Sequence, residues 1–281
     1  DLFIGRKLIK SLNGDVLFYL QNTLIKGVKI KQIMYMDQPI PFQKEKKFSL
    51  FNKSERNFAI YQYFIGYFVR KSVKKANKTI VQTNWLKNVL VNEYNVKENN
   101  VFVIKPSINV SVYNNNLEWN NNIFFYPSSD AIYKNHKCIY AACDILDKEK
   151  IDYTIYLTID KPNYIVSKNI VFLGHISRNQ VFDYYKKSTL LFPSYIESFG
   201  LPMEEAKSIG TFILASDCFF SHEILDDYEN VCFFKYYSPQ ELAFFMKKII
   251  FNELRLNKKV KNKVSITDNS WEKVIKNVLC N

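Results

Sequence analysis

Short apolar runs alternate along this chain with stretches of helical periodicity. Most of the runs are continuously apolar and rich in Val, Ile, Phe or Tyr, which is typical of strands buried on both faces of a sheet. Strands are expected at 16–20, 29–36, 79–83, 101–104, 123–126, 153–158, 170–173, 189–192, 211–215 and 231–234. Helices are expected at 52–76, 84–94, 134–147, 177–187, 202–209 and 238–254. This alternation predicts an α/β protein with parallel sheets.

One segment, VYNNNLEWNNN at 112–122, interrupts the alternation because it is polar, rich in Asn and without periodicity. We interpret it as an interdomain linker. The prediction is a first domain over 1–117 and a second over 118–267, followed by a terminal helix within 265–279. Open α/β sheets bind ligands outside the carboxyl ends of their strands, so the informative residues should directly follow strands.

Composition limits the classes of protein that remain. Lys and Arg number 39 against 27 Asp and Glu, a net charge of +12, which fits nucleic acid, an anionic membrane surface or anionic substrates. An A/T-rich genome that favours Lys and Asn would produce the same excess. The five cysteines and three histidines are scattered, which argues against zinc and a disulfide framework and fits a reducing cytosol. No apolar run is long enough for a transmembrane helix, and no signal peptide is expected.

Glycine is scarce, with seven residues in 281. No two of them form G-x-G, and none begins a P-loop sequence. This excludes the usual dinucleotide fingerprint and the usual phosphate-binding loop. Any phosphate that the protein holds must therefore be held with very little glycine.

The segment PSYIESFGLPMEEAKSIGTFILASD at 193–217 carries the most specific chemistry. A predicted strand ends, a loop delivers Glu197, and Gly200 allows the backbone to approach a ligand closely. Pro202 stands where a first helical turn would begin, and the free N–H groups of such a turn favour an anion or hydroxyls. Glu205 follows one turn into the helix, so that two carboxylates could accept hydrogen bonds from one elongated polyol.

This string resembles the donor-site signature of glycosyltransferase family 4, P-S-x-x-E-x-F-G-L-P-x-x-E-A, with a strand resuming as S-D. The matching residues are Pro193, Ser194, Glu197, Phe199, Gly200, Leu201, Pro202, Glu205, Ala206, Ser216 and Asp217. The resemblance implies a retaining bacterial glycosyltransferase with the GT-B fold, in which two Rossmann-like parallel-sheet domains face a cleft. It also implies that the terminal helix, over 268–281, crosses back to the first domain.

The resemblance implies roles for individual residues of the second domain. Glu197 would contact the donor sugar and Glu205 the nucleotide ribose. The loop of Ser198, Phe199, Gly200 and Leu201 would face the sugar and phosphates.

Two further stretches of the second domain complete the resemblance. In FFYPSSDAIYKNHK, Lys134 corresponds to the pyrophosphate-binding lysine, and Ser128 stands where many relatives carry a phosphate-binding Arg. In FLGHIS, the residues Gly174, His175 and Ile176 would lie near the base.

The first domain matches more loosely. QIMYMDQPIPF at 32–42 resembles a strand and loop that usually read His-Gln-x-x-P-F, with Asp37 in place of the histidine. Asp37 is therefore a candidate to orient a sugar hydroxyl, or a mark of altered activity. The family's early glycine-containing loop is not visible, and we expect this domain to be incomplete.

The resemblance also implies a function. A sugar would pass from a nucleotide sugar to a hydroxyl of a saccharide or lipid-linked saccharide, in cell-surface polysaccharide or glycolipid assembly. Neither a metal nor another cofactor is expected. The alternative is a weak or inactive member that binds a nucleotide sugar or scaffolds a complex. Nucleic-acid binding is suggested by nothing in the sequence except the net charge of +12.

The expected location is the cytoplasm, with possible contact at the inner face of the membrane. The segment 58–77 mixes aromatic residues with Arg70, Lys71, Lys74 and Lys75. As a helix it could lie on an anionic bilayer. Alternatively, its aromatic side chains pack into the domain core and its basic end is solvated.

Overall fold

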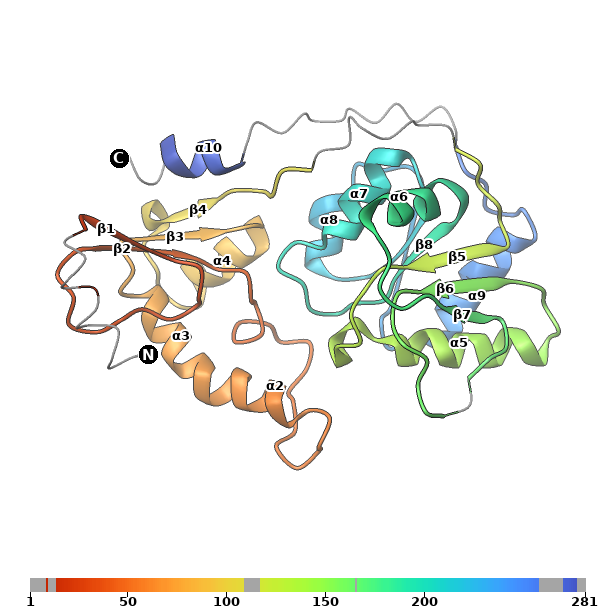
Figure 1. Cartoon of the computed structure of the whole chain (residues 1–281), viewed down its shortest axis with the longest axis horizontal. Helices are drawn as coiled ribbons and strands as arrows, with labels where there is room; N and C mark the ends of the chain where they lie inside the picture. The colour runs from red at the N-terminus through yellow and green to blue at the C-terminus, as the bar shows by residue number, and fades with distance from the viewer. Residues whose placement is uncertain (1–8, 10–13, 109–116, 165, 258–269, 277–281) are drawn as a thin grey trace. The chain divides into compact units, whose positions relative to one another are not determined.

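The computed structural model describes residues 9, 14–108, 117–164, 166–257 and 270–276 (Figure 1). The chain divides into two compact units. Unit 1 comprises Asp1–Ser107, Ile196–Phe199 and Thr267–Asn281, and unit 2 comprises Ile108–Tyr195 and Gly200–Ile266.

Unit 1 is built on a parallel sheet with the order β1-β2-β3-β4. Its strands are β1 (Val16–Tyr19), β2 (Lys31–Tyr35), β3 (Lys78–Val81) and β4 (Val101–Val103). Successive side chains of a strand point to opposite faces. Met34 and Val81 accordingly join one buried cluster, whereas Ile33 and Ile80 join another. Both faces of this sheet are therefore covered by apolar side chains.

One long helical segment packs against the first of these clusters. It consists of α2 (Arg56–Ile60), a π-helical turn η1 (Tyr61–Ile65) and α3 (Gly66–Val73), which form a continuous rod in Figure 1. The sequence predicted this helix but not the π-helical turn within it. Two further elements are α4 (Asn84–Asn92) and the short η2 (Glu98–Asn100).

Unit 2 contains a six-stranded parallel sheet with the order β10-β9-β8-β5-β6-β7. The strands are β5 (Ile123–Tyr126), β6 (Thr154–Leu157), β7 (Ile170–Phe172), β8 (Thr189–Phe192), β9 (Ile213–Ser216) and β10 (Val231–Phe234). Phe125 pairs with Tyr156 on one side and with Leu190 on the other. Every residue of β8 and β9 is buried, which confirms the prediction from their continuous apolar runs.

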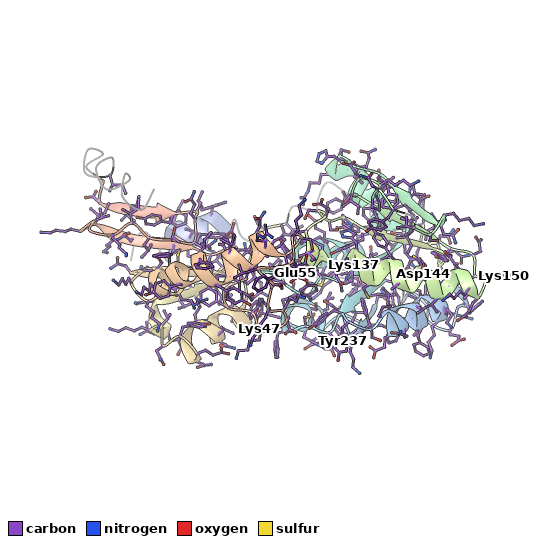
Figure 2. The ribbon with its side chains drawn as sticks, turned by 90° about the horizontal axis from the view of Figure 1, so that it is seen from below. Lys47, Glu55, Lys137, Asp144, Lys150 and Tyr237 are labelled. Atoms are coloured by element: carbon purple, nitrogen blue, oxygen red, sulfur yellow. The ribbon has the colours of Figure 1, made fainter. Side chains whose placement is uncertain are left out.

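Helices cover both faces of the sheet in unit 2. They are η3 (Ile132–Lys134), α5 (His136–Lys148), α6 (Arg178–Lys187), α7 (Leu201–Ile209), α8 (Phe219–Leu225) and α9 (Pro239–Ile250). Figure 1 shows α5 and α9 on one face and α6, α7 and α8 on the other. In Figure 2, Lys137 and Asp144 lie along α5, on its exposed side.

Local sequence explains where several of these helices begin and end. Ser177 and Gln180 form a reciprocal capping box at the start of α6. Ser238 caps α9, whose first residue is Pro239. Gly210 ends α7 at φ 93°, in the left-handed region that glycine adopts without strain.

The terminal helix α10 (Ser270–Val274) packs against the sheet of unit 1. The Trp271 ring stacks on Tyr35 with 6.0 Å between ring centroids, and it forms a T-shaped contact with the Phe18 ring. Val274 is buried in the cluster that contains Ile33 and Ile80. The rest of the terminal helix predicted within 265–279 lies outside the described residues.

The linker predicted at 112–122 lies partly outside the described residues, and its described part, 117–122, is neither helix nor strand. Helix α8 was not predicted, because it spans only seven residues and follows β9 almost directly.

Candidate functional site

The segment between β8 and α7 depends on a glycine at its turn. Gly200 has φ 91° and precedes the first residue of α7, Leu201, which is exposed. A Cβ at Gly200 would lie 2.5 Å from the terminal methyl of Met203 and 3.4 Å from the Phe192 ring. The positive φ favours glycine here, whereas the Met203 methyl ends a flexible side chain that could shift. The turn leaves the start of α7 at the carboxyl end of a central strand.

Glu205 lies on the second turn of α7, buried at 6% exposure, and its two carboxylate oxygens have different partners. Oε1 pairs with Arg178 Nη2 at 2.8 Å, and Oε2 accepts a hydrogen bond from Tyr185 Oη at 3.1 Å. Both partners come from α6. Burial raises the pKa of the Glu205 carboxyl, and the Arg178 charge only partly offsets this. Sequence reasoning identified Glu205 but not Arg178 or Tyr185.

The loop after β5 is fixed to the loop after β8 by hydrogen bonds. Asn135, in the left-handed conformation at φ 63°, donates through Nδ2 to the carbonyl oxygens of Pro193 and Tyr236. Tyr126 Oη donates to the carbonyl oxygen of Lys134 at 3.1 Å. The backbone of Lys134, the last residue of η3, is therefore held beside the segment that leads to α7.

Ser128 lies in the same loop and is tied to its neighbours. Its Oγ is hydrogen-bonded to His136 Nε2 at 3.0 Å, and its backbone N–H donates to Thr158 Oγ1. Burial lowers the pKa of His136 to about 4, so the ring is neutral at pH 7. Neither side chain of this pair carries a positive charge at neutral pH, so neither replaces the phosphate-binding arginine that the family resemblance implied at the Ser128 position. His136 and Asn135 were missed as site residues, although both stand in the K-N-H string.

The loop after β7 leads directly into the start of α6. Gly174 has φ 61°, His175 is exposed, and Ile176 is half-buried. Ser177 then caps α6, whose first residue is Arg178. The predicted base-side loop therefore runs directly into the helix whose first residue, Arg178, pairs with Glu205.

Asp37 is the candidate residue from the first domain, and it follows β2 in unit 1. Its carboxylate accepts a hydrogen bond from Asn22 Nδ2 at 3.1 Å, and the same Nδ2 donates to Tyr61 Oη at 3.1 Å. Burial raises the pKa of Tyr61, and the Asp37 charge acts in the same direction. Asn22 and Tyr61 were missed, although Asn22 stands just after the first strand and Tyr61 opens the π-helical turn.

The other predicted residues fall in the segment Ile196–Phe199, which clusters with unit 1. Glu197 and Ser198 are half-buried and Phe199 is buried. Within the described residues, no group of three or more His, Cys, Asp or Glu side chains has an arrangement that could hold a metal ion.

The match to a protein family covers more than half of the chain. Residues 112–265 match the family described as glycosyl transferases group 1. The chain belongs to this family. The matched region covers almost all of unit 2, including Ser128, Lys134 and Glu205, so the family assignment rests on the part of the chain that carries the predicted donor site.

One curated relative is the O-antigen chain mannosyltransferase RfbU of Salmonella typhimurium. It is 24% identical over 179 residues, which cover 59% of this chain and 49% of that protein. The chain therefore spans about half the length of this relative.

Solved structures of glycosyltransferases resemble the whole chain in fold. The pneumococcal O-GlcNAc transferase GtfA, solved with UDP and GlcNAc, has a TM-score of 0.67 at 17% identity, over 99% of this chain and 60% of that one. Anabaena HepE, solved with UDP-glucose, has a TM-score of 0.62 at 12% identity, over 97% and 77%. These likenesses confirm the predicted fold class, GT-B with two Rossmann-like parallel-sheet domains. No helix among the described residues is long and apolar enough to cross a membrane.

Proposed function

We propose that this group 1 glycosyltransferase is a retaining enzyme of family 4 that transfers a sugar from a nucleotide sugar to an acceptor hydroxyl. The observation that carries the proposal is the pair Glu197 and Glu205, spaced around a glycine turn that opens a helix at the end of a central strand. The residues around this pair match the family 4 signature over a long stretch and in the same order. UDP is the first nucleotide to test, because GtfA and HepE were solved with UDP or a UDP-sugar.

The donor would bind along the loops that follow β5, β7 and β8. Glu205 would accept hydrogen bonds from the ribose hydroxyls, while Gly174, His175 and Ile176 would contact the base. Lys134 and the backbone N–H groups from Ser198 to Leu201 would hold the diphosphate. The proposal is supported by the hydrogen bonds of Asn135, which fix the Lys134 loop beside the β8 loop.

The reaction would break the bond between the anomeric carbon and the diphosphate. Negative charge develops on the departing phosphate, and Lys134 together with the α7 N-terminus would stabilise it without a divalent metal. Glu197 would position the sugar as positive charge develops at its ring. For retention, the departing phosphate would accept the acceptor proton on the face where the new bond forms.

The acceptor proposed is a saccharide or lipid-linked saccharide of a cell-surface polysaccharide or glycolipid, at the inner face of the cell membrane. The support is the relative RfbU, an O-antigen chain mannosyltransferase. Asp37 would orient an acceptor or donor hydroxyl in its position after β2. Its contact with Asn22, which also contacts Tyr61, gives its carboxylate a defined orientation for this role.

A transfer assay with product analysis tests the proposal. The product should keep the anomeric configuration of the donor, observed by NMR, and turnover should persist after treatment with EDTA. Glu197→Ala should lower turnover by at least about a hundredfold, as expected when a group that stabilises the transition state is lost. The control Glu253→Ala removes the same charge from an exposed position in unit 2. A product with the opposite anomeric configuration, or unchanged turnover in Glu197→Ala, would contradict this mechanism.

A further inference from the structure

The long helical segment of unit 1 has an exposed apolar face. Six large side chains of α2, η1 and α3 point to solvent, and we call them the aromatic face. They are Ile60, Tyr63, Phe64, Ile65, Tyr67 and Phe68, with exposed fractions from 37% to 61%. The opposite side of the same segment is buried through Ala59, Val69 and Val73. The aromatic side chains therefore do not fill the core of unit 1, which was one of the two interpretations of the sequence.

Exposed cations border the aromatic face. Between residues 50 and 77 the exposed charged side chains are all basic: Lys53, Arg56, Lys71, Lys74 and Lys75. The single acidic residue of this stretch, Glu55, is buried and pairs with Lys46 at 3.1 Å. Lys26 Nζ also lies 5.8 Å from the centre of the Phe68 ring. No exposed carboxylate of this stretch competes for the cations.

This combination matches the chemistry of an anionic lipid surface. Tyr and other aromatic rings partition to the headgroup level of a bilayer, and lysines bordering them are attracted by anionic lipids. A second copy of this chain, joined across a two-fold axis, would set the same cationic border against itself. Charge complementarity therefore favours the membrane over self-association.

We propose that the aromatic face docks on a membrane surface that contains anionic lipids, with its cations at the headgroups. This docking is independent of the catalytic proposal, since it uses none of the donor-site residues. It would hold the chain at the surface on which a lipid-linked acceptor resides.

Co-sedimentation with vesicles tests the docking. The full chain should sediment with vesicles of phosphatidylcholine and phosphatidylglycerol, and not with phosphatidylcholine alone. Added salt should release it, because screening weakens the attraction of the lysines. Equal binding to both vesicle types, or binding to neither, would overturn the proposal.

Matched variants identify the face responsible. Phe64→Ser should weaken vesicle binding about tenfold, whereas Phe251→Ser should not, although the two side chains are 61% and 59% exposed. The triple change of Lys71, Lys74 and Lys75 to Gln should also weaken it about tenfold. The control set consists of Lys148, Lys161 and Lys168 changed to Gln, all exposed in unit 2.

Two further measurements keep the result interpretable. Circular dichroism and thermal unfolding establish that each variant folds, and if Phe64→Ser does not, the lysine set decides alone. Light scattering detects self-association. One outcome would overturn the membrane proposal: the unaltered chain forms a dimer and does not bind vesicles, and the dimer is lost in Phe64→Ser. The aromatic face would then bind a second copy of the chain. Equal losses in the control variants would also contradict the docking.

Discussion

Glu205 is the predicted donor-site residue with the most closely defined surroundings. A buried carboxylate needs partners for its charge, and here both partners come from α6 rather than from a ligand. Ribose hydroxyls that bind to Glu205 would have to share these oxygens with Arg178 and Tyr185. The α6 residues therefore determine the charge and orientation of the group that is proposed to hold the nucleotide.

Glu205→Gln should affect the stability of the fold and the affinity for the nucleotide in opposite directions. The folded state raises the pKa of Glu205 above its value in the unfolded chain, so ionising this carboxyl lowers the stability as pH rises from the ordinary glutamate pKa through the folded-state pKa. The neutral amide lacks this loss, so chemical unfolding above the ordinary glutamate pKa should show equal or greater stability. Calorimetry should show at least about tenfold weaker nucleotide binding, since a buried charged acceptor is lost. Loss of stability together with unchanged binding would contradict both roles.

Arg178→Gln should destabilise the protein by about 1–3 kcal/mol, because it leaves the buried Glu205 charge without its cation. The double variant with Glu205→Gln should recover most of this loss, so that the two changes are strongly non-additive in urea unfolding. Arg255→Gln removes the same charge from an exposed site and serves as the control. Additive effects would show that the ion pair does not couple the two helices.

At the scale of elements, His222 links α8 to the end of β9. Its Nε2 is hydrogen-bonded to Asp217 at 2.7 Å and its Nδ1 to Asp226 at 2.6 Å, and the ring stacks on Phe233 of β10. Burial opposes the charge of the ring, but the two carboxylates outweigh it and raise the pKa of His222. The missed helix α8 is thus attached to its sheet by a charge that depends on pH.

This attachment predicts a pH-dependent stability. A raised histidine pKa stabilises the folded state fully below the ordinary value of about 6.5, and this contribution is lost as pH rises through the folded-state pKa. His222→Gln should therefore cost stability at pH 6 and much less at about pH 8 in unfolding series. His136, with its lowered pKa, acts in the opposite direction, but it is present in both proteins and cancels. A difference that does not vary with pH would contradict the charged link.

The sequence predicted the strands better than the contacts between helices. The strands β8 and β9 are apolar at three of their four positions, so their burial follows largely from composition, although Thr189 and Ser216 are buried with them. The pairing of Arg178 with Glu205 depends on how α6 and α7 lie against each other, which no local pattern specifies. The Asn22 contact with Asp37 likewise joins two loops through the pairing of β1 with β2.

At the scale of the whole molecule, residues from both ends of the described chain form unit 1. Helix α10 contributes Trp271 and Val274 to the face of the sheet that carries Ile33 and Ile80. The sequence indicated a terminal helix from its cap and apolar spacing, but the surface that it covers came only from the family resemblance. Unit 1 thus depends on a segment far away in the sequence.

Removing the buried anchor of α10 should destabilise unit 1. Val274→Ala deletes methyl groups at 2% exposure and should cost about 1–2 kcal/mol in chemical unfolding. The neighbouring Ile275 is 50% exposed, so Ile275→Ala provides the control and should change stability by less than about 0.5 kcal/mol. Equal effects of the two changes would mean that α10 does not pack as described.

The most direct test of the donor site is calorimetric titration with UDP-, GDP-, ADP- and CMP-linked sugars. We expect one nucleotide class to bind, with UDP tested first. Lys134→Gln should weaken that binding at least about tenfold, because a diphosphate loses a charged partner. Lys137→Gln, exposed on the first turn of α5, should leave it unchanged (Figure 2). Binding of none of these sugars, or equal affinity in the Lys134 and Lys137 variants, would contradict the account.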